Sequence, residues 1–174
     1  MKNIEVILTK EMIEYRIKNL GKSISNYYKY SKIELIIIGL LRGSFIFVAD
    51  LCREITLSHQ IDFMFISSYA NSLFSDHKIN ILKDLELDIE GKNVLLVDDI
   101  IDSGYSLKTI YDLLILRKPK SLLICTLLDK PACRIVNVEV SWTGFSISNE
   151  FVIGYGMDNA QNYRHLPYIG KLIP

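Results

Sequence analysis

The feature that most constrains the fold is the stretch of residues 93–109, NVLLVDDIIDSGYSLKT. It begins with a short, unbroken apolar run, Val94–Val97, which is typical of a strand buried on both faces of a parallel sheet. Two carboxylates, Asp98 and Asp99, follow this run, and apolar residues recur at helical spacing from Leu107 onwards. The stretch therefore predicts a buried strand, an acidic tip, a glycine-containing turn and a helix.

The turn at residues 102–106 and the acidic pair before it predict a ligand site. Ligands bind at the carboxyl ends of the strands in open α/β sheets. Free backbone N–H groups at a helix N-terminus suit a phosphate, and the hydroxyls of Ser103 and Ser106 add donors. Asp98 and Asp99 suit ribose hydroxyls or a Mg²⁺ ion bound to them. The alternative interpretation is an acidic loop in which Asp or Ser is the helix N-cap.

A second turn of the same kind follows the apolar run of residues 35–40. Leu41-Arg42-Gly43-Ser44 comes next and leads into a predicted helix that begins at Phe45. A glycine turn at a helix start again favours an anion site. An ordinary turn with Ser44 as the N-cap is the alternative.

The remaining apolar patterns predict an α/β fold with a central, mostly parallel sheet flanked by helices. The sequence shows no linker, repeat or composition shift, so we expect one domain over residues 1–174. The C-terminal tail, residues 163–174, is predicted to be irregular. The predicted strands are residues 4–8, 35–40, 61–67, 79–82, 94–97, 121–128 and 138–147, and the predicted helices begin near Thr9, Phe45 and Leu107.

Composition narrows the function classes. The 20 basic and 20 acidic residues cancel, which argues against a nucleic-acid partner. The three cysteines have no metal-ligand or disulfide spacing. No run approaches the roughly 18 apolar residues of a membrane span, and the N-terminus is too charged for a signal peptide. We therefore expect a cytoplasmic protein with no membrane partner.

These motifs, in their order, resemble those of type I phosphoribosyltransferases, and most closely the bacterial hypoxanthine (hypoxanthine-guanine) branch. The loop that binds phosphoribosyl pyrophosphate (PRPP) in that family has four apolar residues, two acids, two apolar residues and D-[ST]-G, as residues 94–104 do. The other shared motifs are L-[KR]-G-S at residues 41–44, a Ser-Tyr pair at 68–69, LLDKP at 127–131 and FVIGYGMD at 151–158.

The resemblance implies an enzyme that transfers 5-phosphoribosyl from PRPP to a 6-oxopurine, hypoxanthine or guanine, releasing pyrophosphate and giving IMP or GMP. It further implies Mg²⁺ as cofactor, a small hood over the sheet, a flexible lid loop and a homo-oligomer, either a dimer or a tetramer. Two alternatives remain. One is a phosphoribosyltransferase for another base such as xanthine, and the other is a PRPP-sensing, nucleic-acid-binding regulator of the same fold.

The resemblance also implies a role for each motif residue. Asp102 acts as the general base, and Lys130 donates to the 6-oxo group of the purine. The implied sets are Asp98, Asp99, Asp102, Ser103, Gly104, Tyr105 and Ser106 for ribose and 5′-phosphate; Arg42, Gly43, Ser44 and Arg164 for pyrophosphate; Ser68 and Tyr69 for the lid; Lys130, Phe151, Val152 and Asp158 for the purine; and Asp98, Asp99 and Asp158 for the metal.

Three positions depart from the family pattern. Asp98 stands where many members have Glu, so its carboxylate reaches one methylene less far towards the sugar. Asn159 replaces a common Tyr, and Ile153 replaces Val. In the family the peptide bond equivalent to Leu41–Arg42 can be cis.

Overall fold

The computed structural model describes residues 3–68 and 79–173, which form eight strands, three α-helices and one 3-10 turn. The strands are β1 (Ile4–Leu8), β2 (Leu35–Leu41), β3 (His59–Ser68), β4 (Ile79–Lys83), β5 (Asn93–Ile101), β6 (Ser121–Asp129), β7 (Trp142–Ser146) and β8 (Ile169–Leu172). The helices are α1 (Lys10–Tyr28), α2 (Phe45–Glu54) and α3 (Tyr105–Ile115), and the 3-10 turn η1 is Pro131–Cys133.

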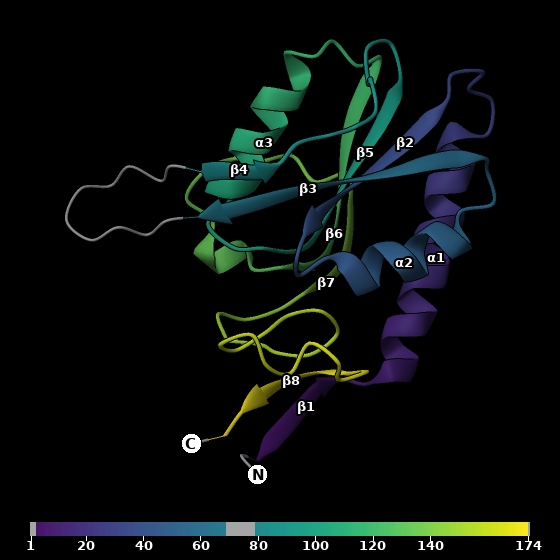
Figure 1. The fold of residues 1–174 in the computed structure, drawn as a ribbon. Helices are drawn as coiled ribbons and strands as arrows, with labels where there is room; N and C mark the ends of the chain where they lie inside the picture. Colours follow the sequence, from purple (N-terminus) through teal and green to yellow (C-terminus); the bar gives the residue numbers. More distant parts are fainter. Residues whose placement is uncertain (1–2, 69–78, 174) are drawn as a thin grey trace.

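The main sheet has six strands in the order β4-β3-β2-β5-β6-β7, with β5 near its centre (Figure 1). All neighbours are parallel except β3 and β4, which form an antiparallel hairpin. Helical connections return the chain to the same end of the sheet, which is what parallel pairing requires. The predicted α/β class with a mostly parallel sheet is confirmed.

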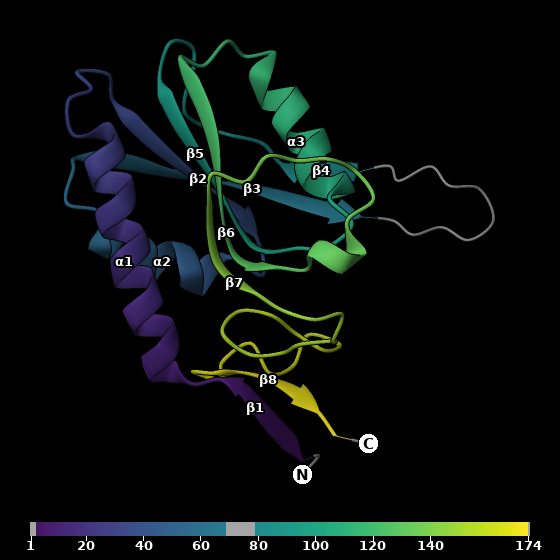
Figure 2. The ribbon, with the colours of Figure 1, turned by 180° about the vertical axis from the view of Figure 1, so that it is seen from behind.

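Helices cover both faces of this sheet. Helices α1 and α2 lie on one face and α3 on the other, as the two opposite views agree (Figures 1 and 2). Strand β2 has no polar side chain because alternate residues enter different cores: Ile37 packs on the α1–α2 side, and Ile36 packs on the α3 side. Both are fully buried, so a packed layer on each face of the sheet holds β2 in place.

The acidic pair lies inside β5 and not beyond it, contrary to the prediction that the strand stops at Val97. Pairing with β6 continues through Asp98 opposite Thr126 to Ile101 opposite Asp129. The strand continues because β6 is equally long and supplies partners for Asp98, Ile100 and Ile101. The two carboxylates are therefore held by a sheet ladder, which is stiffer than a loop.

Helix α1 begins where predicted, with Thr9 as its N-cap, and the Thr9 hydroxyl accepts from the backbone N–H of Met12 at 3.4 Å. The same helix contacts the last strand of the sheet. The Arg16 guanidinium donates to the carbonyl of Gly144 at 2.7 Å and to that of Thr143 at 2.6 Å. These two bonds tie α1 to β7, which is shorter than the predicted strand at residues 138–147.

The C-terminal part of the chain forms a small hood on the side where β2 ends (Figure 1). Strand β8 pairs antiparallel with β1, so the prediction of an irregular tail over residues 163–174 was wrong for Ile169–Leu172. The pairing needs Gly170, because a Cβ atom there would lie 2.6 Å from the carbonyl oxygen of Glu5. Between β7 and β8 the chain has only isolated bridges, such as Ile153 with Gly170. In the described part of the chain, no helix has both the length and the apolar character of a membrane span.

Candidate active site

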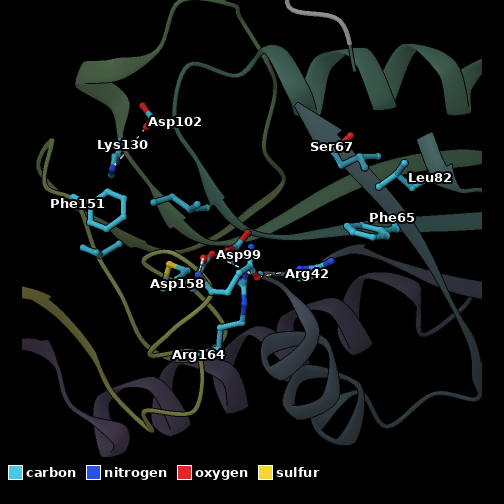
Figure 3. Close-up of a pocket in the computed structure, with 16 residues that line it drawn as sticks. Arg42, Phe65, Ser67, Leu82, Asp99, Asp102, Lys130, Phe151, Asp158 and Arg164 are labelled. Carbon is cyan, nitrogen blue, oxygen red and sulfur yellow. Dashed lines mark hydrogen bonds and ion pairs between the residues drawn. The ribbon is translucent and has the colours of Figure 1, made fainter. Parts of the chain in front are cut away.

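A pocket of about 640 Å³ opens between the strand ends and the hood (Figure 3). Its strand side comes from the ends of β2, β3, β5 and β6, and its hood side comes from the segment between β7 and β8. The lining residues are Arg42, Gly43, Phe65, Ile66, Ser67, Leu82, Asp99, Ile100, Asp102, Lys130, Phe151, Val152, Met157, Asp158, Gln161 and Arg164. The pocket thus joins predicted residues that are up to 122 positions apart in the sequence, Arg42 and Arg164.

The turn after β5 has the predicted strand–turn–helix form. Its helix cap is Gly104, with φ +89° and no side-chain cap, so the alternative of an Asp or Ser N-cap was wrong. A Cβ atom at Gly104 would lie 2.8 Å from the carbonyl oxygen of Val136. The Ser103 carbonyl accepts from the N–H groups of Ile135 and Val136, both at 3.0 Å. These bonds fix the turn at the start of α3, directly after Asp102, which lines the pocket.

The carboxylate of Asp99 lies directly against the second glycine turn. A Cβ atom on Gly43 would be 1.8 Å from Asp99 Oδ2, so the space that a side chain would fill holds the carboxylate instead. Burial, and then the charge of Asp99, raises the pKa of Asp98 well above its usual range. Burial also raises the pKa of Asp99, although Asp98 and Arg164 oppose that rise. The strand tip therefore brings two carboxyl groups together where burial removes water from their charged forms.

These observations fit a divalent cation at the strand tip. Oxygen donors suit Mg²⁺, which commonly uses one or two protein carboxylates together with substrate phosphates. The buried hydroxyl of Thr126, in register with Asp98, has no hydrogen-bond partner among the described residues. Asp158 differs, because its Oδ1 pairs with Arg164 at 2.7 Å and its Oδ2 accepts from the N–H of Gln161 at 2.7 Å. Within the described ranges no group of three or more His, Cys, Asp and Glu side chains gathers to hold a metal.

Lys130, at the end of β6, points into the pocket next to Asp102 (Figure 3). Its side chain is 8% exposed, and its Nζ lies 3.7 Å from Asp102 Oδ2. The ring of Phe151, 62% exposed, stands at the rim beside it, and Val152 is buried. A planar apolar surface next to one buried cation and one exposed carboxylate is suited to a flat, polar heterocycle.

The second glycine turn positions Arg42. The Leu41–Arg42 peptide bond is cis. The Arg42 guanidinium lies over the ring of Phe65, with Cζ 4.9 Å from the ring centroid. Ser44 occupies the N-cap position of α2 without capping it, because its fully buried hydroxyl donates to the carbonyl of Leu40 at 2.5 Å. What this turn offers a ligand is therefore its backbone and Arg42.

Comparisons with known proteins agree with this geometry. The family model described as a phosphoribosyl transferase domain matches residues 3–160. The hypoxanthine phosphoribosyltransferase of Escherichia coli is 56% identical over 170 residues, covering 98% of this chain and 96% of that one. The chain belongs to the phosphoribosyltransferase family. The predicted family and enzyme class are confirmed.

Solved structures of phosphoribosyltransferases have the same fold. A hypoxanthine phosphoribosyltransferase from Staphylococcus aureus matches with a TM-score of 0.92 and 44% identity, covering 98% of this chain and 91% of that one. A Trypanosoma cruzi hypoxanthine phosphoribosyl transferase matches with a TM-score of 0.94 and 37% identity, covering 98% and 91%. The latter structure concerned the role of the C-terminal region on oligomeric state and enzymatic activity.

Seven lining residues of this phosphoribosyltransferase pocket escaped the sequence analysis. They are Phe65, Ile66, Ser67, Leu82, Ile100, Met157 and Gln161. Most of them belong to strands or follow motif residues, so proximity to the motifs was a usable signal. Gln161 carries no such signal, since it lies in a polar run, NAQNY, that matches no motif. Of the predicted lid pair, Ser68 is the last residue of β3, and Tyr69 lies outside the described residues.

Proposed function

We propose that this phosphoribosyltransferase transfers 5-phosphoribosyl from PRPP to a 6-oxopurine, hypoxanthine or guanine, giving IMP or GMP and pyrophosphate. The observation that carries the proposal is the shared pocket, in which Lys130 and Phe151 lie in the same cavity as Asp99 at the acidic tip of β5 and two arginines. The E. coli relative, named for hypoxanthine, supports the same substrate class.

Purine selection follows from the donor chemistry of Lys130. A buried ammonium group only donates hydrogen bonds, so it pairs with a 6-oxo group, whereas adenine presents a donor at that position. The wrong base would present no acceptor to this buried ammonium group, and a missing hydrogen bond to a buried polar group is the situation in which pockets discriminate most strongly. The ring of Phe151 stacks on the base, and the backbone of Val152 reads its edge.

Asp102 acts as the general base. As the purine nitrogen bonds to the anomeric carbon of the ribose, the bond from that carbon to pyrophosphate breaks, and the carbon becomes oxocarbenium-like. The imidazole proton of the purine passes to the Asp102 carboxylate, which is 55% exposed and therefore able to pass it on to solvent. The Lys130 ammonium group lies 3.7 Å from the Asp102 carboxylate, so the proposed base and the purine-binding cation are neighbours.

The other half of the pocket stabilises the leaving pyrophosphate. Arg42, Arg164 and the backbone of Gly43 and Ser44 surround that position, and charge-assisted bonds to phosphate oxygens are among the strongest. Asp98 and Asp99 hold the ribose hydroxyls and, with the substrate, the Mg²⁺ ion. Bound there, Mg²⁺ supplies charge neutralisation to the pyrophosphate. The Ser103–Ser106 turn holds the 5′-phosphate at the N-terminus of α3, and Asp158 completes the site by fixing Arg164.

We further propose a single-domain, cytoplasmic homo-oligomer, a dimer or a tetramer, with no nucleic-acid or membrane partner. The balanced charge of the chain supports the absence of a nucleic-acid partner. The T. cruzi relative, whose structure concerned its oligomeric state, supports asking how this chain assembles. Light scattering coupled to gel filtration measures the assembly directly.

The deciding experiment is a steady-state assay of PRPP and Mg²⁺ with hypoxanthine, guanine, xanthine and adenine in turn. We expect turnover with hypoxanthine and guanine and a kcat/KM for adenine lower by about 10⁴ or more, as for pockets built around one hydrogen bond. Preferred turnover of adenine would contradict the Lys130 argument. Absence of turnover with all four bases, together with tight binding in a nucleic-acid filter assay, would favour a PRPP-sensing regulator.

A further inference from the structure

One amide oxygen joins the two arginines of the pocket. Gln161 Oε1 accepts from Arg42 Nη1 at 3.0 Å and from Arg164 Nη2 at 3.0 Å. These arginines come from different parts of the chain, the end of β2 and the hood, 122 positions apart. Gln161 is therefore the side chain that links the strand side of the pocket to its hood side.

The backbone at Gln161 is also fixed. Its φ is +66°, in the left-handed region, and its N–H donates to Asp158 Oδ2 at 2.7 Å. Non-glycine residues in this region usually persist where the surroundings determine them. The strained backbone and the bond to Asp158 together hold the amide oxygen within hydrogen-bond distance of the two guanidinium groups.

The two arginines depend on Gln161 to different degrees. Arg164 has two further partners, since Nη1 donates to the carbonyl of Gly156 at 2.7 Å and Nη2 pairs with Asp158 at 2.7 Å. Arg42 forms no ion pair with any carboxylate of the described residues, and its contacts there are Gln161 and the ring of Phe65. Loss of the amide oxygen would therefore release Arg42 much more than Arg164.

The neutrality of the amide matters as well as its position. A carboxylate at residue 161 would accept the same two bonds and cancel positive charge that an anion needs. An amide orients both guanidinium groups and leaves the charge of Arg42 uncompensated by the residues described. Orientation in advance lowers the entropy lost when an anionic ligand binds.

We propose that Gln161 is a positioning residue that presets Arg42, together with Arg164, for the pyrophosphate group of PRPP and of the product. This inference rests on the proposed function, because it names the group that the two arginines receive. Gln161 acts through the arginines and contacts no reacting atom.

The test compares Gln161→Met, which keeps the length of the side chain and removes the acceptor, with the wild type. Isothermal titration in buffer with Mg²⁺ measures pyrophosphate binding to the IMP-loaded enzyme and, separately, IMP binding to the free enzyme. We expect pyrophosphate to bind about 10-fold more weakly and KM for PRPP to rise by a similar factor. This factor is at the lower end of the range for a hydrogen bond to a charged group, because the site is open to water. The IMP affinity and the KM for hypoxanthine should stay within twofold of the wild-type values. The melting temperature should stay within about 2 °C of wild type.

A double-mutant cycle separates positioning from a general structural effect. In an Arg42→Ala background, Gln161→Met should cost less than about threefold, since the group it positions is gone. Equal losses in both backgrounds would overturn the inference. Gln60→Met is the matched control, because Gln60 is exposed near the start of β3 and does not line the pocket, and it should change nothing.

A second variant decides the matter if Gln161→Met fails to fold. Gln161→Glu keeps the acceptor oxygen and adds a negative charge, so pyrophosphate binding should again weaken, by a factor that shrinks as salt is raised. Unchanged pyrophosphate affinity in a folded Gln161 variant, with normal wild-type turnover, overturns the role of Gln161 alone. A wild-type protein that releases no pyrophosphate from PRPP and a purine overturns the proposed function itself.

Discussion

The two walls of the pocket are built by different means. The strand side places Asp99, Asp102 and Lys130 at the ends of β5 and β6, which are paired along their length and packed between two helical layers. The hood side places Phe151 and Arg164 on a segment that has only isolated bridges, and six of its residues from Gly154 to Tyr163 have positive φ. The comparison teaches that an exposed side chain on the paired strands, such as Asp102, can change with little loss of stability, whereas a backbone change in the tight turns of the hood should lower stability and activity together.

The largest expected effect is on the strand side. Asp102→Asn removes the proposed base and keeps its shape, so kcat should fall by about 10²–10⁴ while the melting temperature changes little. The reason for the small stability effect is exposure, since the Asp102 side chain is 55% exposed. Pre-steady-state product formation and a thermal melt measure the two quantities. Near wild-type turnover would remove the general-base role and blur the contrast between the walls.

The next effect is on the hood side. Gly156→Ala places a Cβ atom 2.1 Å from the carbonyl oxygen of Gly43, at a φ of +99°. The clash is with backbone, which cannot swing away, so we expect a loss of at least about 2 kcal/mol in unfolding free energy and lower activity through the displaced turn. Urea denaturation measures the loss. Gly91→Ala is the control, because Gly91 has φ +70° and nothing within 4 Å of the added Cβ, so it costs only the strain of about 1–2 kcal/mol.

A smaller effect tests how the hood is anchored to the helical layer. The hydroxyl of Tyr155 donates to the carboxylate of Asp50 on α2, and burial raises the pKa of Tyr155. Tyr155→Phe removes this bond and should lower the unfolding free energy by about 1–2 kcal/mol. Tyr15→Phe, at a side chain that is 71% exposed, should leave it unchanged. Equal denaturation midpoints for the two variants would mean that the hood does not depend on this bond.

The smallest effect is a gain in stability, whereas the two preceding substitutions lower it. The pKa of Asp98 is raised by burial and by the charge of Asp99, so the native state binds protons more tightly than the unfolded state. Stability then falls as pH rises from about 4, the ordinary value of a free carboxyl group, through the raised native value. Without ligands, Asp98→Asn should therefore be more stable than the wild type at pH 8, and the difference should shrink towards pH 4. If the stability difference between Asp98→Asn and the wild type grew as the pH was lowered, the predicted direction would be wrong.

Hydrophobic patterning accounts for the part of the fold that the sequence predicts well. The runs at Leu35–Leu40 and Val94–Val97 are apolar at every position, which is possible only where both faces of a strand are covered. That inference makes these runs strands of one parallel sheet, whose polar ends meet at one edge. The ligand site expected at Asp98, Asp99 and the turn after them follows from this logic, whereas the roles of Asp102 and Lys130 came from the family resemblance.

The hood shows where the same reasoning stops. Strand β8 has four residues and depends on the closeness of Gly170 to Glu5, a contact between opposite ends of the chain that no local pattern encodes. Gln161 was missed for a related reason. Its importance lies in one oxygen that meets two arginines distant in sequence, and neither periodicity nor a motif reports such a meeting. The resemblance to a family supplied the hood residues, and the patterning of the chain did not.

The Arg16 bonds to Thr143 and Gly144 have a consequence for how the protein behaves in a crowded cell. Strand β7 is the last strand of the sheet, and a last strand with open carbonyls invites another chain to add to it. The Arg16 guanidinium is bound to two consecutive carbonyls of this strand, and consecutive carbonyls point to opposite sides, so an added strand would have to displace it from the one on the open edge. We therefore expect Arg16 to oppose the pairing of β7 with a strand of another molecule.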